Sequence, residues 1–356
     1  METKAPPRVA AAGALARVGV LALALVSGAC GSRTGLEGIA IEAIPDAGVD
    51  APLVPKTCTP DGLRRVLTTG LASPARMALN GGEVFVTLAG SGDGRVVRVA
   101  TKDGTTDEIA RGQDGPIDIV AERDNVFWLN AGEGALHAYA RSFSTQRVVD
   151  DMLGATLQGL AVDLAFLYVG NTNGPLRKIP KSPVERREIV LVPSVQGTPA
   201  IATDDDRVYY LDSSSLGLRS VDKLGNAPRT HMGGPGRALV VDGGAMFSVA
   251  TDGTNATIIS QPTSGGVVTT VVTSSGGIID RLVVDADHVY FTEGIAAANG
   301  MRWSVRAVPR VGGAPVTLAD DTGPIADIGV DDICAYWIER GSGASLVRVP
   351  KVTNLH

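Results

Sequence analysis

The chain has 356 residues, a formal net charge of −6, 44 glycines and 20 prolines, and only 20% of its residues are charged. A mildly acidic chain without a run of Lys and Arg lacks the basic surface that nucleic-acid binding requires, so we exclude that class of partner. No segment keeps the apolar period of a helix, which excludes a helical or α/β fold.

The first residues have the pattern of a secretory signal peptide. Lys4, Arg8 and Arg17 precede or flank an apolar run at 18–26, VGVLALALV. This run is too short to span a bilayer, which needs about 20 residues. Small residues then lead to Cys30, so the segment has the charged, apolar and small-residue regions of an export signal in the expected order.

This end of the chain resembles the lipobox of bacterial lipoproteins, in which a cysteine becomes the lipidated first residue of the mature protein; Ser27 stands where Leu is usual. We predict a signal peptide over 1–29, lipidation of Cys30 and a flexible tether over 30–57. The alternative is an ordinary cleaved signal near an unmodified cysteine. The opening CGSRTGL resembles envelope lipoproteins of Gram-negative soil bacteria, which implies a cell-envelope location. Gly31, in place of the Asp that retains lipoproteins at the inner membrane, favours the outer membrane.

A pattern of about 42 residues then recurs seven times, which indicates a repeat architecture. Each copy has an apolar segment, an acidic or Asn residue, and an aromatic residue. The aromatic residues are Phe85, Phe127, Tyr168, Tyr209, Phe247, Tyr290 and Tyr336. Five positions before them stand Asn80, Glu122, Asp163, Asp204, Asp242, Asp285 and Asp331. Eight positions before them stand Met77, Ile119, Leu160, Ile201, Leu239, Leu282 and Ile328.

These columns predict strands and turns. Consecutive apolar residues indicate a strand that is buried on both faces, and the acidic residue after it is expected to cap a tight turn. Two further short strands follow in each copy, joined by turns such as Gly312-Gly313. Four antiparallel strands in about 42 residues make one propeller blade. We therefore predict an all-β fold over 58–356, a seven-bladed β-propeller with four-stranded antiparallel blades.

The last copy ends without a fourth strand, and the N-terminal end offers one at Arg65–Thr68. We predict that this strand pairs with the last blade and closes the ring, which also removes an open sheet edge. Cys58 comes just before that strand and Cys334 lies at the first turn of the last copy. We predict a disulfide between them, which export permits. The alternative is two separately buried thiols.

Few residues suggest chemistry. Asp204, Asp205 and Asp206 form the densest acidic segment, and with Trp303 they are the candidates for ligand contact. We favour a solvated turn over a Ca²⁺ site there, because the spacing of EF-hand ligands is missing. His137, His231, His288 and His356 occupy non-equivalent positions, so we expect surface or turn histidines. We predict no catalytic residue, no metal site and no cofactor.

Three segments, VYFTEG at 289–294, VYYLD at 208–212 and AYWIERG at 335–341, resemble the signature of the YWTD, NHL and TolB-like propellers. Such propellers mostly bind proteins or glycans, and a minority are enzymes with a metal in the central channel. We predict a monomeric, non-enzymatic binding or scaffold module for a protein or glycan, attached to the membrane only through its lipid. The alternative is a lyase or hydrolase with a divalent metal in the channel.

Overall fold

The computed structural model describes residues 58–59, 61–182, 187–197, 200–213, 217–232, 236–298, 300–341 and 343–352. All of them belong to the second of two units of the chain, Pro55–His356. The predicted signal peptide, Cys30, the tether and His356 lie outside the described residues. Within the described ranges, no helix is long and apolar enough to cross a membrane.

The described residues form seven four-stranded antiparallel sheets. The first three contain β2 (Pro74–Asn80), β3 (Glu83–Leu88), β4 (Gly94–Ala100) and β5 (Thr106–Gln113); β6 (Pro116–Ala121), β7 (Asn125–Asn130), β8 (Ala135–Ala140) and β9 (Thr145–Asp150); and β10 (Leu157–Val162), β11 (Phe166–Asn171), β12 (Gly174–Pro180) and β13 (Ile189–Val195). The next two contain β14 (Ile201–Thr203), β15 (Arg207–Asp212), β16 (Gly217–Asp222) and β17 (Arg229–Met232); and β18 (Gly236–Asp242), β19 (Ala245–Thr251), β20 (Asn255–Pro262) and β21 (Thr269–Ser275). The last two contain β22 (Gly277–Val284), β23 (His288–Ala297), β24 (Gly300–Pro309) and β25 (Val316–Thr322); and β26 (Ile325–Val330), β27 (Cys334–Glu339), β28 (Ser345–Pro350) and β1 (Arg65–Thr69).

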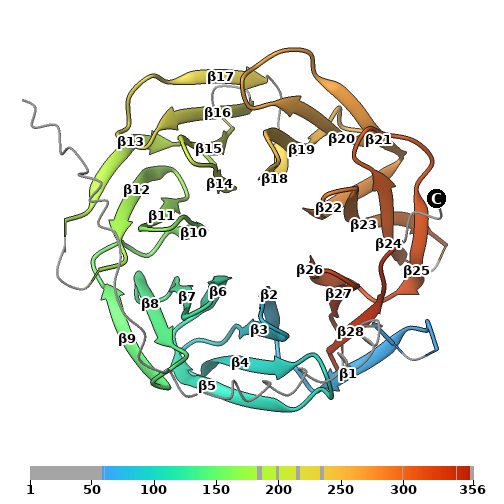
Figure 1. Ribbon diagram of the computed structural model, residues 1–356, viewed down its shortest axis with the longest axis horizontal. Coiled ribbons are helices and arrows are strands. Elements are labelled where there is room, and N and C mark those ends of the chain that lie inside the picture. Colours follow the sequence, from blue (N-terminus) through green and yellow to red (C-terminus); the bar gives the residue numbers. More distant parts are fainter. Residues whose placement is uncertain are drawn as a thin grey trace, which may run out of the picture. The chain divides into compact units, whose positions relative to one another are not determined.

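The sheets stand side by side around a central axis, with the first strand of each nearest the axis (Figure 1). First strands of neighbouring sheets contact each other around the whole ring, including β26 and β2. The fold is therefore a seven-bladed β-propeller, which confirms the predicted fold class. We number the blades 1 to 7 from β2 onward, so that blade 7 contains β26, β27, β28 and β1.

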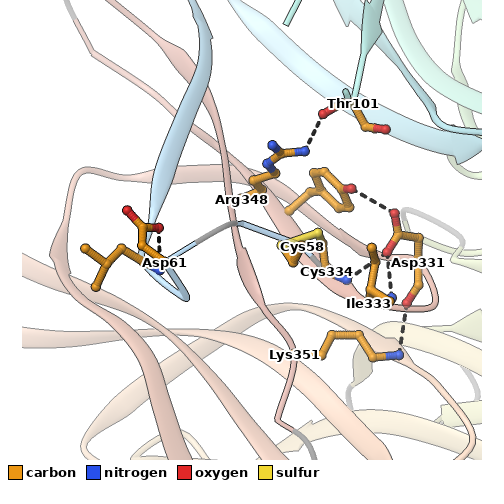
Figure 2. Close-up of a disulfide and its surroundings, with 10 residues drawn as sticks. Cys58, Asp61, Thr101, Asp331, Ile333, Cys334, Arg348 and Lys351 are labelled. Carbon is orange, nitrogen blue, oxygen red and sulfur yellow. Dashed lines mark hydrogen bonds between the residues drawn. A yellow bond between two sulfur atoms is a disulfide. The ribbon is translucent and has the colours of Figure 1, made fainter. Parts of the chain in front are cut away.

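Blade 7 is built from both ends of the described chain. Strand β1 pairs antiparallel with β28, with Val66 opposite Val347. Just before β1, Cys58 forms a disulfide with Cys334, the first residue of β27, across 276 positions of sequence and with 5.3 Å between the Cα atoms (Figure 2). Both cysteines are buried in the core between blades 7 and 1. The disulfide therefore fastens the N-terminal strand to the blade that it completes.

The antiparallel order gives the propeller two faces. The connector face carries the links from one blade to the next and the hairpins between second and third strands. The turn face carries the turns between first and second strands and between third and fourth strands.

The aromatic residues of the repeat fill the spaces between blades. All seven anchor aromatics are almost fully buried. Where two aromatics are adjacent, they point to opposite faces of the strand: Phe127 packs in the core toward blade 3, and Trp128 in the core toward blade 1. Both members of such a pair therefore belong to the cores between blades.

Acidic residues cap the first turn in four blades. Asp163 Oδ1 accepts hydrogen bonds from the backbone N–H groups of Ala165 and Phe166, and its Oδ2 accepts one from the Tyr168 hydroxyl at 2.7 Å. The same three bonds occur at Asp204, Asp285 and Asp331. The predicted turn-capping role is therefore confirmed for these four, and each also holds the anchor tyrosine five residues on.

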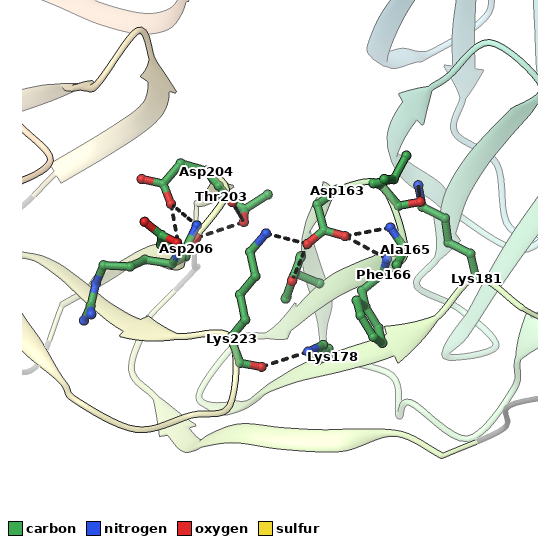
Figure 3. Close-up of polar contacts among 12 residues, drawn as sticks. Asp163, Ala165, Phe166, Lys178, Lys181, Thr203, Asp204, Asp206 and Lys223 are labelled. Atoms are coloured by element: carbon green, nitrogen blue, oxygen red, sulfur yellow. Dashed lines mark hydrogen bonds and ion pairs between the residues drawn. The ribbon is translucent and has the colours of Figure 1, made fainter. Parts of the chain in front are cut away.

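A further column joins each blade to the one before it. We call the residue directly after each third strand the latch residue. The latch residues are Thr101, Arg141, Lys181, Lys223, Thr263, Arg310 and Lys351. The five basic ones reach back to the capping residue of the preceding blade and lie over its anchor aromatic, as Lys223 does with Asp163 and Tyr168 (Figure 3).

Candidate functional site

The predicted acidic segment lies in a turn on the turn face. Asp204 is occupied in capping that turn, where its carboxylate binds the backbone N–H groups of Asp206 and Arg207 (Figure 3). Asp205 and Asp206 are exposed. Among the described residues, no group of three or more His, Cys, Asp or Glu side chains is placed to hold a metal ion.

Trp303 lies elsewhere, near the hairpin of β23 and β24 on the connector face. It is half-buried and packs against the core between blades 6 and 7. It stands opposite Gly294, where a Cβ atom would come within 3.1 Å of the indole ring. The structure therefore does not bring Trp303 together with Asp204, Asp205 and Asp206.

The expectation of a surface or turn position is wrong for His137, which lies inside β8 and is only 6% exposed. His288 is also buried, but it does end a turn: its backbone N–H donates to the Asp285 carboxylate that caps the turn. His137 is held by Glu133, with 2.7 Å between Nε2 and Oε1, and stacks on Trp128. His137 thus occupies a buried strand position instead of the surface or turn position that was expected.

One serine–histidine pair has the distance of a nucleophile and its base. Ser220 Oγ lies 2.7 Å from His231 Nε2. However, Ser220 is completely buried and its hydroxyl also accepts a hydrogen bond from Arg207 Nε. A nucleophile must meet its substrate, so this pair serves packing within blade 4.

Charged residues occupy one position of the first strand in four consecutive blades. One position before the apolar column, blades 6, 7, 1 and 2 carry Arg281, Asp327, Arg76 and Asp118, so that positive and negative residues alternate. The same position in blades 3, 4 and 5 is small: Gly159, Ala200 and Ala238. The first strands of four consecutive blades are therefore charged at this position, and those of the other three carry small residues.

The two aspartates of this arc also connect blades. Asp118 Oδ2 accepts a hydrogen bond from the backbone N–H of Leu160 in blade 3, and Asp327 Oδ2 accepts one from Met77 in blade 1, both at 2.9 Å. Burial raises the pKa of Asp118 to about 6; the attraction of Arg76 opposes this rise. The carboxylate oxygens are thus engaged by the fold.

A pocket of about 410 Å³ lies at the connector face. We call it the axial pocket. Its walls come from blades 1, 3, 4, 5 and 6, and its lining consists mostly of polar residues: Arg76, Gln158, Gln196, Asp212, Ser213, Arg237, Asp280 and Arg281, with Leu211, Gly217 and Gly236. Two other cavities, of about 600 and 660 Å³, are lined by neighbouring blades only. Convergence of polar groups from five blades singles out the axial pocket as the candidate site.

The arginines of the axial pocket differ in how they are held. Arg281 donates to the backbone oxygens of Ala326 and Asp280 and lies 3.7 Å from the Asp327 carboxylate. Arg76 has one ion pair, at 4.0 Å from Asp118, and its guanidinium makes no hydrogen bond with a described residue. Arg237 is exposed, and its side chain has neither an ion pair nor a hydrogen bond with any residue in the described ranges.

No protein-family model and no curated protein sequence matches the chain. Several solved structures do resemble it. An oligogalacturonate lyase in complex with manganese is 13% identical, with a TM-score of 0.63 over 81% of this chain and 93% of the lyase. Virginiamycin B lyase from Staphylococcus aureus is 10% identical, with a TM-score of 0.60 over 82% and 99%. The computationally designed Ika8 protein is 12% identical, with a TM-score of 0.56 over 80% and 98%. At such identities the likeness shows the propeller fold alone.

Proposed function

We propose that this propeller is a non-enzymatic binding module of the bacterial cell envelope, and that the axial pocket is where it holds its ligand, a group of a protein or glycan. The observation that supports this role most is the convergence of polar side chains from five blades around one cavity. A cavity of about 410 Å³ falls in the range of small-molecule sites, roughly 300–1,000 Å³.

The enzyme alternative needs different residues. A lyase or hydrolase with a divalent metal at the axis would need converging His, Cys, Asp or Glu ligands, and the described residues contain no such group. The lyases among the similar structures share the fold only. Elemental analysis of the purified protein separates the two functions, because a stoichiometric divalent metal would favour the enzyme.

We propose that Cys30 carries the lipid that anchors the protein, at the outer membrane. Sequence alone supports this step. The expected result is that the full-length chain fractionates with membranes and that Cys30→Ser fractionates with soluble proteins. Equal membrane association of both forms would contradict lipid anchoring.

The binding role is tested with the full-length protein in detergent, by cross-linking in envelope extract and by a glycan array. The matched variants are Gln158→Trp, which places a large side chain at an exposed position of the axial pocket, and Leu224→Trp, at a 71% exposed position of the turn face. We expect Gln158→Trp to lose the captured ligand and Leu224→Trp to keep it. Capture that survives Gln158→Trp would place the ligand elsewhere.

A further inference from the structure

The axial pocket has more free donors than free acceptors. A guanidinium carries five N–H donors and no acceptor. The guanidinium groups of Arg76 and Arg237 make no hydrogen bond within the described part of the chain, although both line the pocket. Both therefore offer donors to whatever occupies the pocket.

The acidic side chains near them have partners already. Asp118 and Asp327 accept hydrogen bonds from the backbone of neighbouring blades, and Asp212 is 3% exposed with Arg219 at 3.5 Å. Asp280 lies 3.3 Å from Arg281. Among the charged groups of the lining, those left to meet a ligand are thus mainly positive.

Resting on the binding role proposed above, we infer that the axial pocket binds the carboxylate group of a small ligand through Arg76 and Arg237. Arginine suits this task because its planar fork matches the two oxygens of a carboxylate. Arg281 stands close enough to Arg76 for repulsion to matter: burial lowers the pKa of Arg281, and the charge of Arg76 lowers it further. An anion bound by Arg76 of blade 1 and Arg237 of blade 5 would reduce the repulsion between the positive charges of Arg76 and Arg281.

The surrounding acids select a group with a single negative charge. The carboxylates of Asp118, Asp280 and Asp327 lie beside the arginines, so a doubly charged group would meet repulsion as well as attraction. A carboxylate carries one charge at neutral pH, whereas a phosphate monoester carries about 1.5 to 2. A carboxylate therefore fits this mixed field better than a phosphate.

The test is isothermal titration of the full-length protein with four probes: glucuronate, succinate, glucose and glucose 6-phosphate. Glucose and glucose 6-phosphate keep the sugar frame of glucuronate and replace its carboxylate with a neutral group and a phosphate. The variants are Arg76→Gln and Arg237→Gln, and the control is Arg111→Gln, whose side chain is 86% exposed on the outer strand of blade 1. Because Arg237 is also exposed, its replacement leaves folding intact.

We expect a carboxylate probe to bind the wild type and Arg111→Gln, with no binding of glucose. Each of the two pocket variants should weaken carboxylate binding by at least about tenfold, the loss of one charge-assisted hydrogen bond. The inference is overturned if neither carboxylate binds, if Arg237→Gln binds as the wild type does, or if glucose 6-phosphate binds more tightly than glucuronate. If envelope capture works but these titrations fail, the binding role stands and the carboxylate assignment falls.

Discussion

The Lys223 ammonium of blade 4 lies 2.6 Å from Asp163 Oδ2 in blade 3 (Figure 3). It also lies 5.9 Å from the centre of the Tyr168 ring. One side chain thus binds the cap and the anchor aromatic of the preceding blade. The same relation recurs wherever the latch residue is basic, which is at five of the seven seams between blades. The seams between blades 4 and 5 and between blades 7 and 1 have threonine instead, at 263 and 101.

Replacing Lys223 with methionine should destabilise the propeller. The side chains of Lys223 and Asp163 are 20% and 17% exposed. The free energy of unfolding should therefore fall by about 2 kcal/mol, which lies between the values for an exposed and a fully buried ion pair. Urea unfolding measures it, with Lys102→Met as the control because Lys102 is 81% exposed. In a double-mutant cycle with Asp163→Asn, the two losses should not add. Additive losses would show that Lys223 does not stabilise the chain through Asp163.

The latch also predicts a dependence on acid. Burial alone would raise the pKa of Asp163, but the hydrogen bonds from Lys223, Tyr168 and the backbone of Phe166 outweigh it and lower the pKa to about 2, from 3.8. A lowered pKa means that this stabilisation is present above pH 4 and is lost as the pH falls toward 2. The expected loss is about 2 kcal/mol. Asp163→Asn should remove this part of the acid sensitivity, and an unchanged acid transition in that variant would contradict the assignment.

A basic latch residue can be introduced in blade 5, which has Thr263 at that position. Asp204 binds the Tyr209 hydroxyl as Asp163 binds Tyr168, but within the described residues no basic side chain pairs with it. Thr263→Lys should therefore stabilise the chain by about 1 kcal/mol, measured by thermal or urea unfolding. The same substitution in an Asp204→Asn background should give no gain. Stabilisation that persists in that background would mean that the introduced lysine acts through another partner.

The disulfide should hold the last blade closed. Opening the Cys58–Cys334 bond removes a link across 276 positions and should cost about 2–4 kcal/mol. A reductant should lower the urea midpoint of the wild type and leave that of the Cys58→Ser/Cys334→Ser variant unchanged. If the midpoint of the wild type does not respond to a reductant that opens the bond, the closure of blade 7 does not depend on it.

The sequence predicts what the blades share and misses what differs between them. The anchor aromatics and apolar strands recur seven times because every blade buries the same surfaces, so alignment of the copies finds them. Alignment of the copies can also find the latch residues, because each of them directly follows the third strand of its blade. The charged residues of the first strands could not be found in that way, because Arg76, Asp118 and Gly159 stand at one repeat position and have nothing in common. Only the folded ring brings Arg76 within 4.0 Å of Asp118 and Arg281 within 3.7 Å of Asp327.

The raised pKa of Asp118 gives a last prediction, of opposite sign to that of Asp163. Burial raises the pKa to about 6 from 3.8, against the attraction of Arg76 and with a further rise from Asp327. The folded chain therefore binds the proton more tightly than the unfolded chain does, and the charged carboxylate costs stability at pH 7.

This cost, about 2 kcal/mol, should disappear as the pH falls from 7 to 4. Asp118→Asn, whose amide oxygen can still accept the bond from Leu160, should be more stable than the wild type at pH 7 and should lose that advantage by pH 4. Unfolding in urea at both pH values measures the difference, with the exposed Asp332→Asn as the control. An advantage that is equal at both pH values would mean that Asp118 does not titrate in this range, because only a proton taken up by the folded chain makes the difference depend on pH.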